Sequence, residues 1–553
     1  MSARRQGGGR GAAARAALLA LPVAFLTAFF AWPVASIVLE GLRDEHGWDL
    51  SGVGEVLGSP GLRRVAWFTL WQAAASTALT LLVALPAAHV LARYEFRGRR
   101  VVQALVTVPF VLPTVVVGAA FLALLGPRGP LGVDLDDTVW AILIAHVFFN
   151  HAVVVRTVGG LWEGLDERTE EAARVLGAPR WRAVREVTLP ALRPAIASAA
   201  AIVFLFTFTS FGVVRILGGP RHVTLEAEIY RQTADLLNLP VASVLALLQL
   251  AAVAALLGVQ GHLERRSQAA VRLGPPQRRR ARTRGQRWWV RANLAAMGLL
   301  LVTPLAVLVE RSLRVGAGAG HGLAAWRALG QRTAGTGLFV SPVEALGNSL
   351  RFAAVATVLA VALGALAAAA LTRPGGRVAR AIDATLLLPL GTSAVTIGFG
   401  FLIALDEPID LRASPWLIPA AQAVVALPFV VRTMTPVLRS IDPRLREAAA
   451  VLGASPRRAW LEVDLPLVRR ALLVAAGFAF AISLGEFGAT TVIARADAPT
   501  VPVVIDRLLG RPGALNSGQA FALSVVLMVI TAAVVLLVDL RGRRDHQARG
   551  GWL

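Results

Sequence analysis

Apolar runs of membrane-spanning length recur along the whole chain, and they restrict its fold more than any other feature. About 20 consecutive apolar residues suffice to cross the hydrocarbon core of a bilayer as a helix. Runs of this kind lie near residues 16–39, 65–91, 101–125, 139–160, 191–213, 241–260, 291–310, 346–371, 381–405, 416–438, 468–493 and 519–539. The sequence therefore predicts an all-α polytopic membrane protein with about 12 transmembrane helices.

Composition supports this class and excludes another. Of the 553 residues, 56% are hydrophobic and 16% are charged, and the mean hydropathy is +0.63. A formal net charge of +22 would suit a nucleic-acid partner if the basic residues formed a continuous domain. They gather instead at the ends of the apolar runs, as membrane orientation requires. We therefore expect the lipid bilayer as the surroundings and no nucleic acid as a partner.

Two residue types are missing from the chain, lysine and cysteine. Without lysine there is no G-x-x-x-x-G-K-[ST] phosphate loop, so any ATP chemistry must come from another chain. Without cysteine there are neither disulfides nor thiolate metal sites. The sequence also lacks H-E-x-x-H and G-x-S-x-G motifs. We expect no catalytic residue, no metal site and no enzyme activity in this chain.

One polar segment occurs twice. Residues 171–190 read EAARVLGAPRWRAVREVTLP and residues 447–466 read EAAAVLGASPRRAWLEVDLP, an offset of 276 residues (447 − 171). A closely repeated polar loop between membrane spans predicts a paired docking site for a two-fold symmetric partner. Further matching pairs are Val-Arg-Thr at 155–157 and 431–433, Phe-Gly at 211–212 and 487–488, and Gly118 with Gly398 at an offset of 280.

The repeat divides the chain into two halves of six apolar runs each. An even number of spans per half places both halves in the membrane the same way up, related by an axis along the membrane normal. The expected organisation is an N-terminal tail (1–15), a first repeat (16–260), a basic linker (261–290), a second repeat (291–540) and a C-terminal tail (541–553).

The distribution of arginine predicts the orientation. In a twelve-span chain the tails, the linker, both repeated segments and the loops 92–100 and 372–380 share one side, and all are rich in arginine. The positive-inside rule places that side, with both termini, in the cytoplasm of a multi-pass plasma-membrane protein. A cleaved signal peptide is the alternative for the run 16–39. The run is long for a signal's apolar core and has no clear cleavage site after Pro33.

Each copy of the repeated segment has residues that suit a docking loop. The Glu-Ala-Ala residues favour a helix with small side chains, and the glycine permits a turn between two short helices. The glutamate can pair with arginine on a partner or within the loop, and the proline suits the start of the next span. An amphipathic surface helix duplicated without a role is the alternative. The candidate coupling residues are Glu171, Ala172, Ala173, Gly177, Leu189, Pro190, Glu447, Ala448, Ala449, Gly453, Leu465 and Pro466.

This pattern resembles the Glu-Ala-Ala (EAA) signature of the permease subunits of type I ATP-binding-cassette importers, which have a MetI-like fold. Val187 and Val463 stand where that family often has isoleucine. The fused two-repeat form with a basic linker is similar to the ferric-iron and thiamine permeases in particular. Supporting stretches are AHVFFN (145–150), FTSFGVVRILGGP (208–220), LEAEIY (225–230) and SLGEFGATTV (483–492).

The resemblance implies a set of partners and a role. In that family the loop forms a coupling helix that seats in a groove of the ATPase. We therefore expect an ATPase homodimer on the cytoplasmic side, which binds ATP and Mg, and an extracytoplasmic substrate-binding protein. No cofactor is expected in this chain itself. The resemblance favours ferric iron or thiamine as the substrate, and the sequence does not decide between them.

A second group of residues is expected to line the pathway or its outer gate. Polar side chains inside a membrane are costly and face a pathway or a partner. The candidates are Ser210, Phe211, Ser483, Glu486 and Phe487. Capping of a helix end by Glu486 is the alternative.

Asn150 and His151 lie within the fourth apolar run. We expect them to form a buried hydrogen-bonded pair between helices rather than a ligand site.

The main alternative function is an ion-gradient-driven secondary transporter, which is also often built from six plus six parallel spans. Such a protein should carry carboxylates near the middle of its spans, and the apolar runs here are almost free of them. Co-purification with a soluble ATPase distinguishes the two classes.

Overall fold

The computed structural model describes residues 16–44, 47–48, 51–267, 278–314, 320–332, 337, 339–372, 385–386, 388–389, 392–406, 410–412 and 414–549. The predicted tail 1–15 lies outside the described residues, as do most of the loop 372–380 and parts of the linker and of the C-terminal tail. The fold is almost entirely helical, and its only described sheets are the antiparallel pair β1–β2 and the parallel pair β3–β4.

The elements of the first half are η1 (Thr27–Ala31), α2 (Trp32–Leu42), β1 (Arg43–Asp44), β2 (Gly47–Trp48), α3 (Ser51–Gly58), α4 (Pro60–Arg93), β3 (Tyr94–Glu95), α5 (Arg99–Val111), α6 (Thr114–Leu125), α7 (Val139–Gly164), α8 (Glu167–Val175), α9 (Arg180–Ala183), η2 (Val184–Thr188), α10 (Leu189–Phe208), α11 (Gly212–Leu217), α12 (Leu225–Tyr230), η3 (Arg231–Asp235) and α13 (Leu239–Ser267). Those of the second half are β4 (Arg279–Arg280), α14 (Arg284–Ser312), α15 (Ala324–Arg327), η4 (Ala328–Gly330), α16 (Pro342–Leu371), α18 (Ala394–Ala404), α19 (Leu417–Arg439), α20 (Pro443–Val451), α21 (Pro456–Ala459), η5 (Trp460–Asp464), α22 (Leu465–Gly485), α23 (Gly488–Ile493), α24 (Val501–Leu509) and α25 (Ala514–Arg549).

Among the described residues, ten helices are long and apolar enough to cross a membrane, or eleven if one bent pair counts as a span. The bent pair is α5 and α6, which meet at 105° where a straight third span was expected. Leu112 between them is extended (φ −65°, ψ 140°), because a residue before proline avoids the helical region and Pro113 follows it. In the equivalent run 381–405, the described helix is α18, which has only 11 residues. These two runs account for the difference from twelve.

The two halves exchange their first spans. Leu26 and Phe30, from the first span, pack in one apolar core with Phe401 of α18, and Trp32 Nε1 donates a hydrogen bond to the carbonyl oxygen of Ala404 (3.2 Å). In the other direction, α14 of the second half contributes Met297 to the core of the first half. The halves are therefore interlocked rather than placed side by side as two closed bundles.

The glycines that repeat at an offset of 280 mark equivalent close contacts. A Cβ on Gly118 of α6 would lie 2.8 Å from Ile216 Cδ1 of α11, and a Cβ on Gly398 of α18 would lie 2.8 Å from the carbonyl oxygen of Ala489 of α23. Real Cβ atoms do not approach so closely. The absence of a side chain lets α11 and α23, which follow the fifth and eleventh spans, pack directly on α6 and α18.

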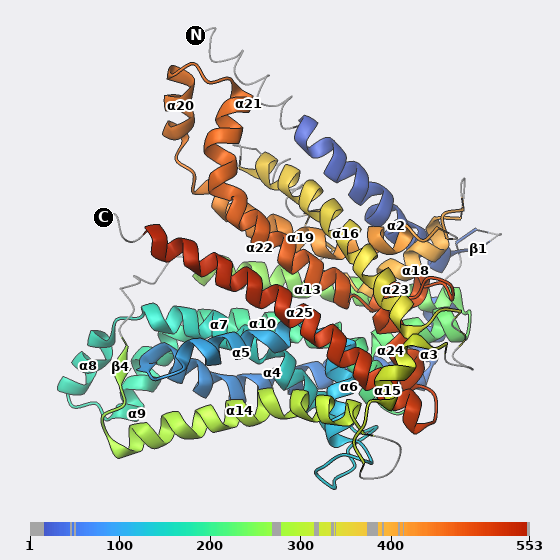
Figure 1. Ribbon diagram of the computed structural model, residues 1–553, viewed down its shortest axis with the longest axis horizontal. Helices are drawn as coiled ribbons and strands as arrows, with labels where there is room; N and C mark the ends of the chain where they lie inside the picture. The colour runs from blue at the N-terminus through green and yellow to red at the C-terminus, as the bar shows by residue number, and fades with distance from the viewer. Residues whose placement is uncertain are drawn as a thin grey trace.

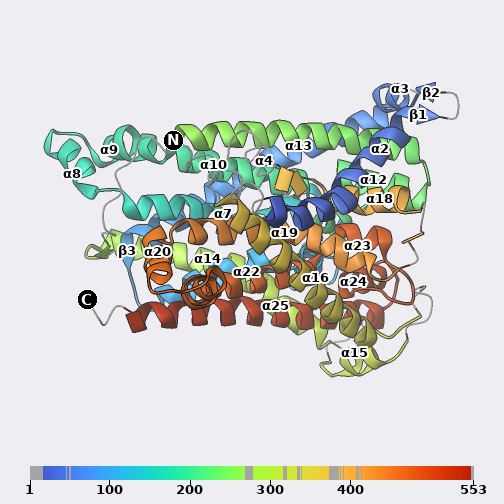
Figure 2. The same ribbon diagram turned by 90° about the horizontal axis from the view of Figure 1, so that it is seen from above.

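The spans run along the long axis of the molecule, and the two repeated loops lie at the same end of it. α8 and α9 of the first loop and α20 and α21 of the second lie at the left of both Figure 1 and Figure 2. The short helices α3, α15 and α24 lie at the opposite end. In Figure 1 the two bundles that carry the loops diverge towards the loop end.

Candidate functional site

The two repeated loops have the same construction, element by element. α8 and α20 are each nine residues long, and an aspartate caps each of them at the N-terminus. Asp166 accepts a hydrogen bond from the backbone N–H of Arg168 (3.0 Å), and Asp442 accepts one from Arg444 (2.9 Å). Such caps satisfy backbone donors that a helix leaves free at its start.

A left-handed glycine ends each of these helices. Gly177 has φ +92° and Gly453 has φ +82°, a conformation that costs a residue with a side chain about 1–2 kcal/mol. A second short helix, a π-helical turn and the next span follow in each copy, and Pro190 and Pro466 lie in the first turn of that span. Leu189 and Leu465 are the first residues of those spans, α10 and α22.

Each loop is fastened to the following span by one polar contact at equivalent positions. In the first loop, Thr188 Oγ1 donates a hydrogen bond to Glu170 Oε2 (3.0 Å). In the second, 276 residues further on, Arg446 Nε donates to Asp464 Oδ1 (2.8 Å). The accepting carboxylate belongs to Glu170 on the loop helix α8 in the first copy, and to Asp464 at the start of the span α22 in the second. The contact is thus present in both loops although its chemistry differs, which indicates that the attachment itself matters.

The outward face of each loop is exposed and partly apolar. The structure describes no buried residue in α8 or α20, and Glu171 and Glu447 have no hydrogen-bond or ion-pair partner among the described residues. The expected option of a pair between these glutamates and loop arginines is therefore not formed. Ala172 and Ala448 are exposed, whereas Ala173 and Ala449 are half-buried. At the tips, Val175, Leu176, Val451 and Leu452 are each 87–88% exposed.

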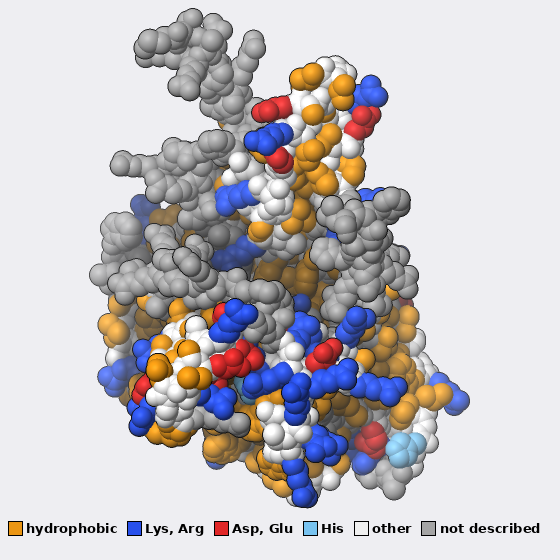
Figure 3. Space-filling model, turned by 90° about the vertical axis from the view of Figure 1, so that its left-hand side faces the viewer, with side chains coloured by type: hydrophobic (Ala, Val, Ile, Leu, Met, Phe, Trp, Pro, Cys, Tyr) orange, Lys and Arg blue, Asp and Glu red, His pale blue; other side chains and the backbone are white. Residues whose placement is uncertain are grey.

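Viewed from the loop end, two projections carry apolar side chains between rows of arginine (Figure 3). Apolar side chains left in water at matched positions are the signature of an interaction surface.

The first loop has an additional support from the linker. Arg93, which is buried, pairs with Glu167 (3.4 Å), and Arg279 of β4 lies 3.8 Å from the same carboxylate. Arg278 pairs with Glu163 at the end of α7. The parallel pairing of β4 with β3 holds this part of the linker against the loop between α4 and α5.

At the other end of the spans, two equivalent phenylalanines meet. The rings of Phe211 and Phe487 stack with centroids 5.1 Å apart and an interplanar angle of 26°. The glycine after each of them packs tightly: a Cβ on Gly212 would clash with Thr114 Oγ1, and one on Gly488 would lie 2.9 Å from Ala394 Cβ. The two halves therefore close on each other at this point.

Below this stack lies a chamber of about 500 Å³, lined by residues of both halves. Of the predicted pathway residues, Ser210, Phe211, Glu486 and Phe487 line it. Ser483 is buried but does not line the chamber.

Glu486 caps a helix, as the alternative interpretation of the sequence expected, and its role in a transport pathway stays a prediction. Its carboxylate caps α23 by accepting from the backbone N–H groups of Ala489 (2.7 Å) and Thr490 (3.0 Å), and it also lines the chamber. These two hydrogen bonds fix the carboxylate at the junction of the eleventh span with α23.

Two chamber residues escaped the sequence analysis. Glu226 on α12 was not among the candidate residues, but it is buried, lines the chamber and accepts a hydrogen bond from Gln249 Nε2 (3.0 Å). α12 is not one of the span-length helices. Burial raises the pKa of the Glu226 carboxyl to about 8, and the nearby Glu486 acts in the same direction. The sequence feature that could have indicated the burial of Glu226 is the set of apolar residues on either side of it in LEAEIY.

The second missed residue is His146 of α7. Its Nδ1 lies 2.9 Å from Ser76 Oγ and its Nε2 lies 2.9 Å from Ser210 Oγ, so it joins two helices and a predicted gate residue. Asn150 donates to the carbonyl oxygen of His146 (3.1 Å) within the same helix, and its Oδ1 is buried without a partner. Neither ring nitrogen of His151 has a partner in the structure. The predicted hydrogen-bonded pair of Asn150 and His151 between helices is therefore wrong.

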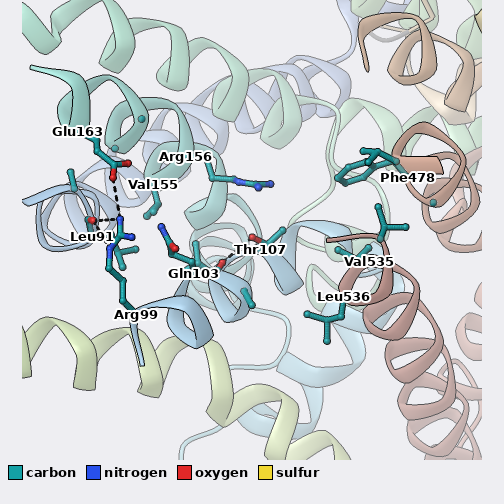
Figure 4. A pocket seen from close by; sticks show the side chains of 18 of the residues that line it. Leu91, Arg99, Gln103, Thr107, Val155, Arg156, Glu163, Phe478, Val535 and Leu536 are labelled. Atoms are coloured by element: carbon teal, nitrogen blue, oxygen red, sulfur yellow. Dashed lines mark hydrogen bonds and ion pairs between the residues drawn. The ribbon is translucent and has the colours of Figure 1, made fainter. Parts of the chain in front are cut away.

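A second cavity of about 430 Å³ lies towards the loop end, and we call it the vestibule. Its lining includes Arg99, Arg156 and Arg470, and Figure 4 shows Arg156 reaching across it towards Phe478. Arg99 is held by Glu163 (3.4 Å) and by the carbonyl oxygen of Leu91. Phe478 lines both the vestibule and the chamber and so marks their boundary.

Comparison with known proteins gives a consistent picture. The family described as "Binding-protein-dependent transport system inner membrane component" matches residues 80–268 and 360–544. These segments start 280 residues apart and end 276 apart (360 − 80 and 544 − 268), the two offsets of the internal repeat.

Curated relatives match most of the chain, and two of them are described here. "Thiamine transport system permease protein ThiP" of Brucella abortus (strain 2308) is 29% identical over 493 residues, which covers 86% of this chain and 87% of the relative. The protein of the same description from Escherichia coli (strain K12) is 27% identical over 498 residues, covering 86% and 88%. A solved bacterial ABC transporter involved in alginate import matches 48% of this chain and 99% of its own, with 17% identity and a TM-score of 0.42.

Proposed function

Because the chain belongs to the family of binding-protein-dependent transport system inner membrane components, we propose that it forms the pathway of an ATP-driven thiamine importer. The protein is a multi-pass membrane transport subunit. The observation that carries the proposal is the pair of equally built loops at one end of the molecule, joined through two long helices to a pair of stacked phenylalanines at the other.

The loops are the proposed seats of an ATPase homodimer. Two identical ATPase subunits need two equivalent contacts facing the same side, and α8 and α20 meet this requirement. Their exposed apolar tips offer contact area, while Glu171 and Glu447 remain free to pair with arginine on the partner. In this proposal ATP and Mg are bound by the partner chains, and a binding protein delivers substrate at the opposite end.

Closure of the ATPase dimer would move the loops as rigid attachments of the spans. The contacts at Glu170 and at Arg446 fix each loop to the start of α10 or α22. A 20-residue helix such as α10 is roughly 30 Å long, so a small tilt at the loop becomes a displacement at the Phe211–Phe487 stack. The bundle needs only two packings that differ by a few kcal/mol.

Thiamine is favoured over ferric iron as the substrate by the two relatives described above, both described as thiamine permeases. Among the described residues there is no group of three or more side chains that could hold a metal ion. Iron delivered on a carrier would not require such a group, so the uptake test also includes ferric iron.

A secondary transporter is not favoured by any feature of the site. The carboxylates that line the chamber, Glu226 and Glu486, lie outside the span-length helices of the described structure. In this proposal they lie at the outer end of the pathway rather than at the mid-span positions that proton or sodium coupling uses.

Reconstitution tests this function. We expect proteoliposomes that contain this chain with its ATPase and its binding protein to accumulate radiolabelled thiamine only with ATP. Uptake of ferric iron instead of thiamine would show that the proposed substrate is wrong. Uptake driven by an ion gradient without the ATPase would show that the chain is not part of an ATP-driven importer. Because the natural chain has no cysteine, single cysteines at Ala172 and Ala448 provide an orientation test. Both should react with an impermeant thiol reagent from the cytoplasmic side alone.

A further inference from the structure

The chamber has an unusual lining for a chain so rich in arginine. Among the described residues seven phenylalanines line it, namely Phe110, Phe149, Phe206, Phe211, Phe429, Phe478 and Phe487, and no arginine does. They come from both halves of the chain. Some of them already contact one another: Phe110 lies 5.9 Å from Phe149 and 5.8 Å from Phe206 between ring centroids.

Two carboxyl groups reach the same chamber from different halves. Glu226 comes from α12 of the first half and Glu486 from the end of α22 in the second. Both side chains are almost completely buried, at 2% and 6% exposure, and among the described residues no arginine lines the chamber to pair with them. A buried acid without a cationic partner is costly, so its presence beside aromatic walls points to a cation supplied from outside.

An unsatisfied hydrogen-bond acceptor provides an independent indication of a ligand. Asn150 lines the chamber, is 1% exposed, and has no hydrogen-bond partner for its Oδ1 among the described residues. Buried amide oxygens are nearly always hydrogen-bonded, so this atom is suited to accept from an N–H or O–H group of a guest. The amide is held in place because its nitrogen donates to the carbonyl oxygen of His146.

We propose that the chamber is a transient binding site for a heteroaromatic cation on its way through the permease. The aromatic walls would hold its rings, Glu226 and Glu486 its positive charge, and Asn150 Oδ1 a donor group. This inference rests on the proposed function, because thiamine has a positively charged thiazolium ring joined to an aminopyrimidine. The chamber volume of about 500 Å³ lies in the range of small-molecule sites, roughly 300–1,000 Å³. Cations are attracted to the faces of aromatic rings.

The vestibule beyond Phe478 supports this assignment by contrast. Its lining includes Arg99, Arg156 and Arg470 and one carboxylate, Glu163. A cation should therefore bind more weakly in the vestibule than in the chamber. The change of lining at this residue confines the proposed site to the chamber.

Direct binding tests the proposal without depending on transport. The full chain, assembled with its ATPase in nanodiscs and without the binding protein, is titrated with radiolabelled thiamine. Competition uses 1-methylnicotinamide as a second heteroaromatic cation, choline as an aliphatic cation and thiochrome as a neutral aromatic. We expect saturable binding of thiamine that 1-methylnicotinamide displaces, and displacement by choline or thiochrome at least tenfold weaker.

Matched variants locate the site. Glu226→Gln and Phe429→Leu should each weaken thiamine binding by tenfold or more. Glu228→Gln, on the same helix α12 but paired with Arg231 and outside the chamber, should change it less than twofold. Phe208→Leu, which is buried in α10 but does not line the chamber, is the control for the lost ring.

The possible results distinguish a failure of the chamber assignment from a failure of the proposed function. If the complete importer transports thiamine but the chain shows no saturable binding, or the Glu226 and Phe429 variants bind normally, the chamber assignment is wrong and the function stands. If thiamine is not transported but 1-methylnicotinamide binds and the variants weaken it, the chamber stands and the substrate must be another heteroaromatic cation. If no heteroaromatic cation binds and thiamine is not transported, both are overturned.

Discussion

The polar contact that attaches the second loop to its span can be tested by replacing it with the equivalent contact of the first loop. Arg446 Nε lies 2.8 and 2.9 Å from the two oxygens of Asp464, and Asp464 is only 6% exposed. Arg446→Ala leaves this carboxylate buried without that partner. The double variant Arg446→Glu with Asp464→Thr recreates the hydrogen bond that Thr188 donates to Glu170 in the first loop.

The expected cost follows from burial. A buried acceptor left unpaired costs about 1–3 kcal/mol, and the 45% exposure of Arg446 places this pair in the lower half of that range. A loss of about 1–2 kcal/mol changes the ratio of attached to detached loop by a factor of roughly 5–30. Transport should respond in the same direction, because a detached loop moves without tilting α22.

Hydrogen exchange of the backbone amides in residues 443–451 measures this ratio directly. In Arg446→Ala we expect exchange roughly 5–30 times faster than in the natural protein, and in the double variant a return to within a few-fold of it. The control is Arg458→Ala in the same loop, which breaks an exposed pair with Glu462 and should change exchange by less than about threefold. If the double variant exchanges as fast as Arg446→Ala, the two loops are not attached in an interchangeable way and the argument fails.

Three further predictions concern coupling, the outer closure and the chamber. Reversing the charge of Glu171 and Glu447 together should abolish ATP-driven uptake while leaving the circular-dichroism melting curve in place; normal uptake would exclude these loops as the coupling element. Phe211→Ala removes an aromatic stack worth about 0.5–1.5 kcal/mol, so we expect the resting complex to leak substrate about 2–10 times faster, measured as efflux without ATP. Because burial raises the pKa of Glu226 to about 8, a cation that prefers the ionised carboxyl must displace a proton below that pH. Thiamine affinity should then rise by up to about tenfold per pH unit from pH 6 to 8 and level off above pH 8. If the same pH dependence is found in Glu226→Gln, it arises from the neighbouring acid Glu486 instead.

The sequence was sufficient for the features that depend on local patterns. Span-length apolar runs, the two loops and their turn glycines could be predicted because length, periodicity and the backbone freedom of Gly177 and Gly453 are local properties. The bend at Leu112 was also encoded locally, by Pro113. It was missed because the apolar run continues through the proline, as it also does at Pro86, which lies inside a continuous helix.

The features that were missed depend on contacts between distant segments. Nothing near Trp32 indicates that it will contact Ala404, because either half offers an equally apolar surface to the first span. Glu226 was not proposed as a pathway residue because a glutamate in a short segment between spans is usually solvated. Its burial results from the approach of α18 and α13, which only the assembled fold brings together.

The exchanged first helix also sets an order for biogenesis. The hydrogen bond between Trp32 and Ala404 joins residues 372 positions apart, and synthesis at about 5–20 residues per second supplies the second of them some 20–70 seconds after the first. During that interval the first span can pack against α13 of its own half, but the face that contacts α18 in the finished protein has no partner. A ribosome that stalls in the second half would therefore leave this face of the helix uncovered, a natural signal for membrane-protein quality control.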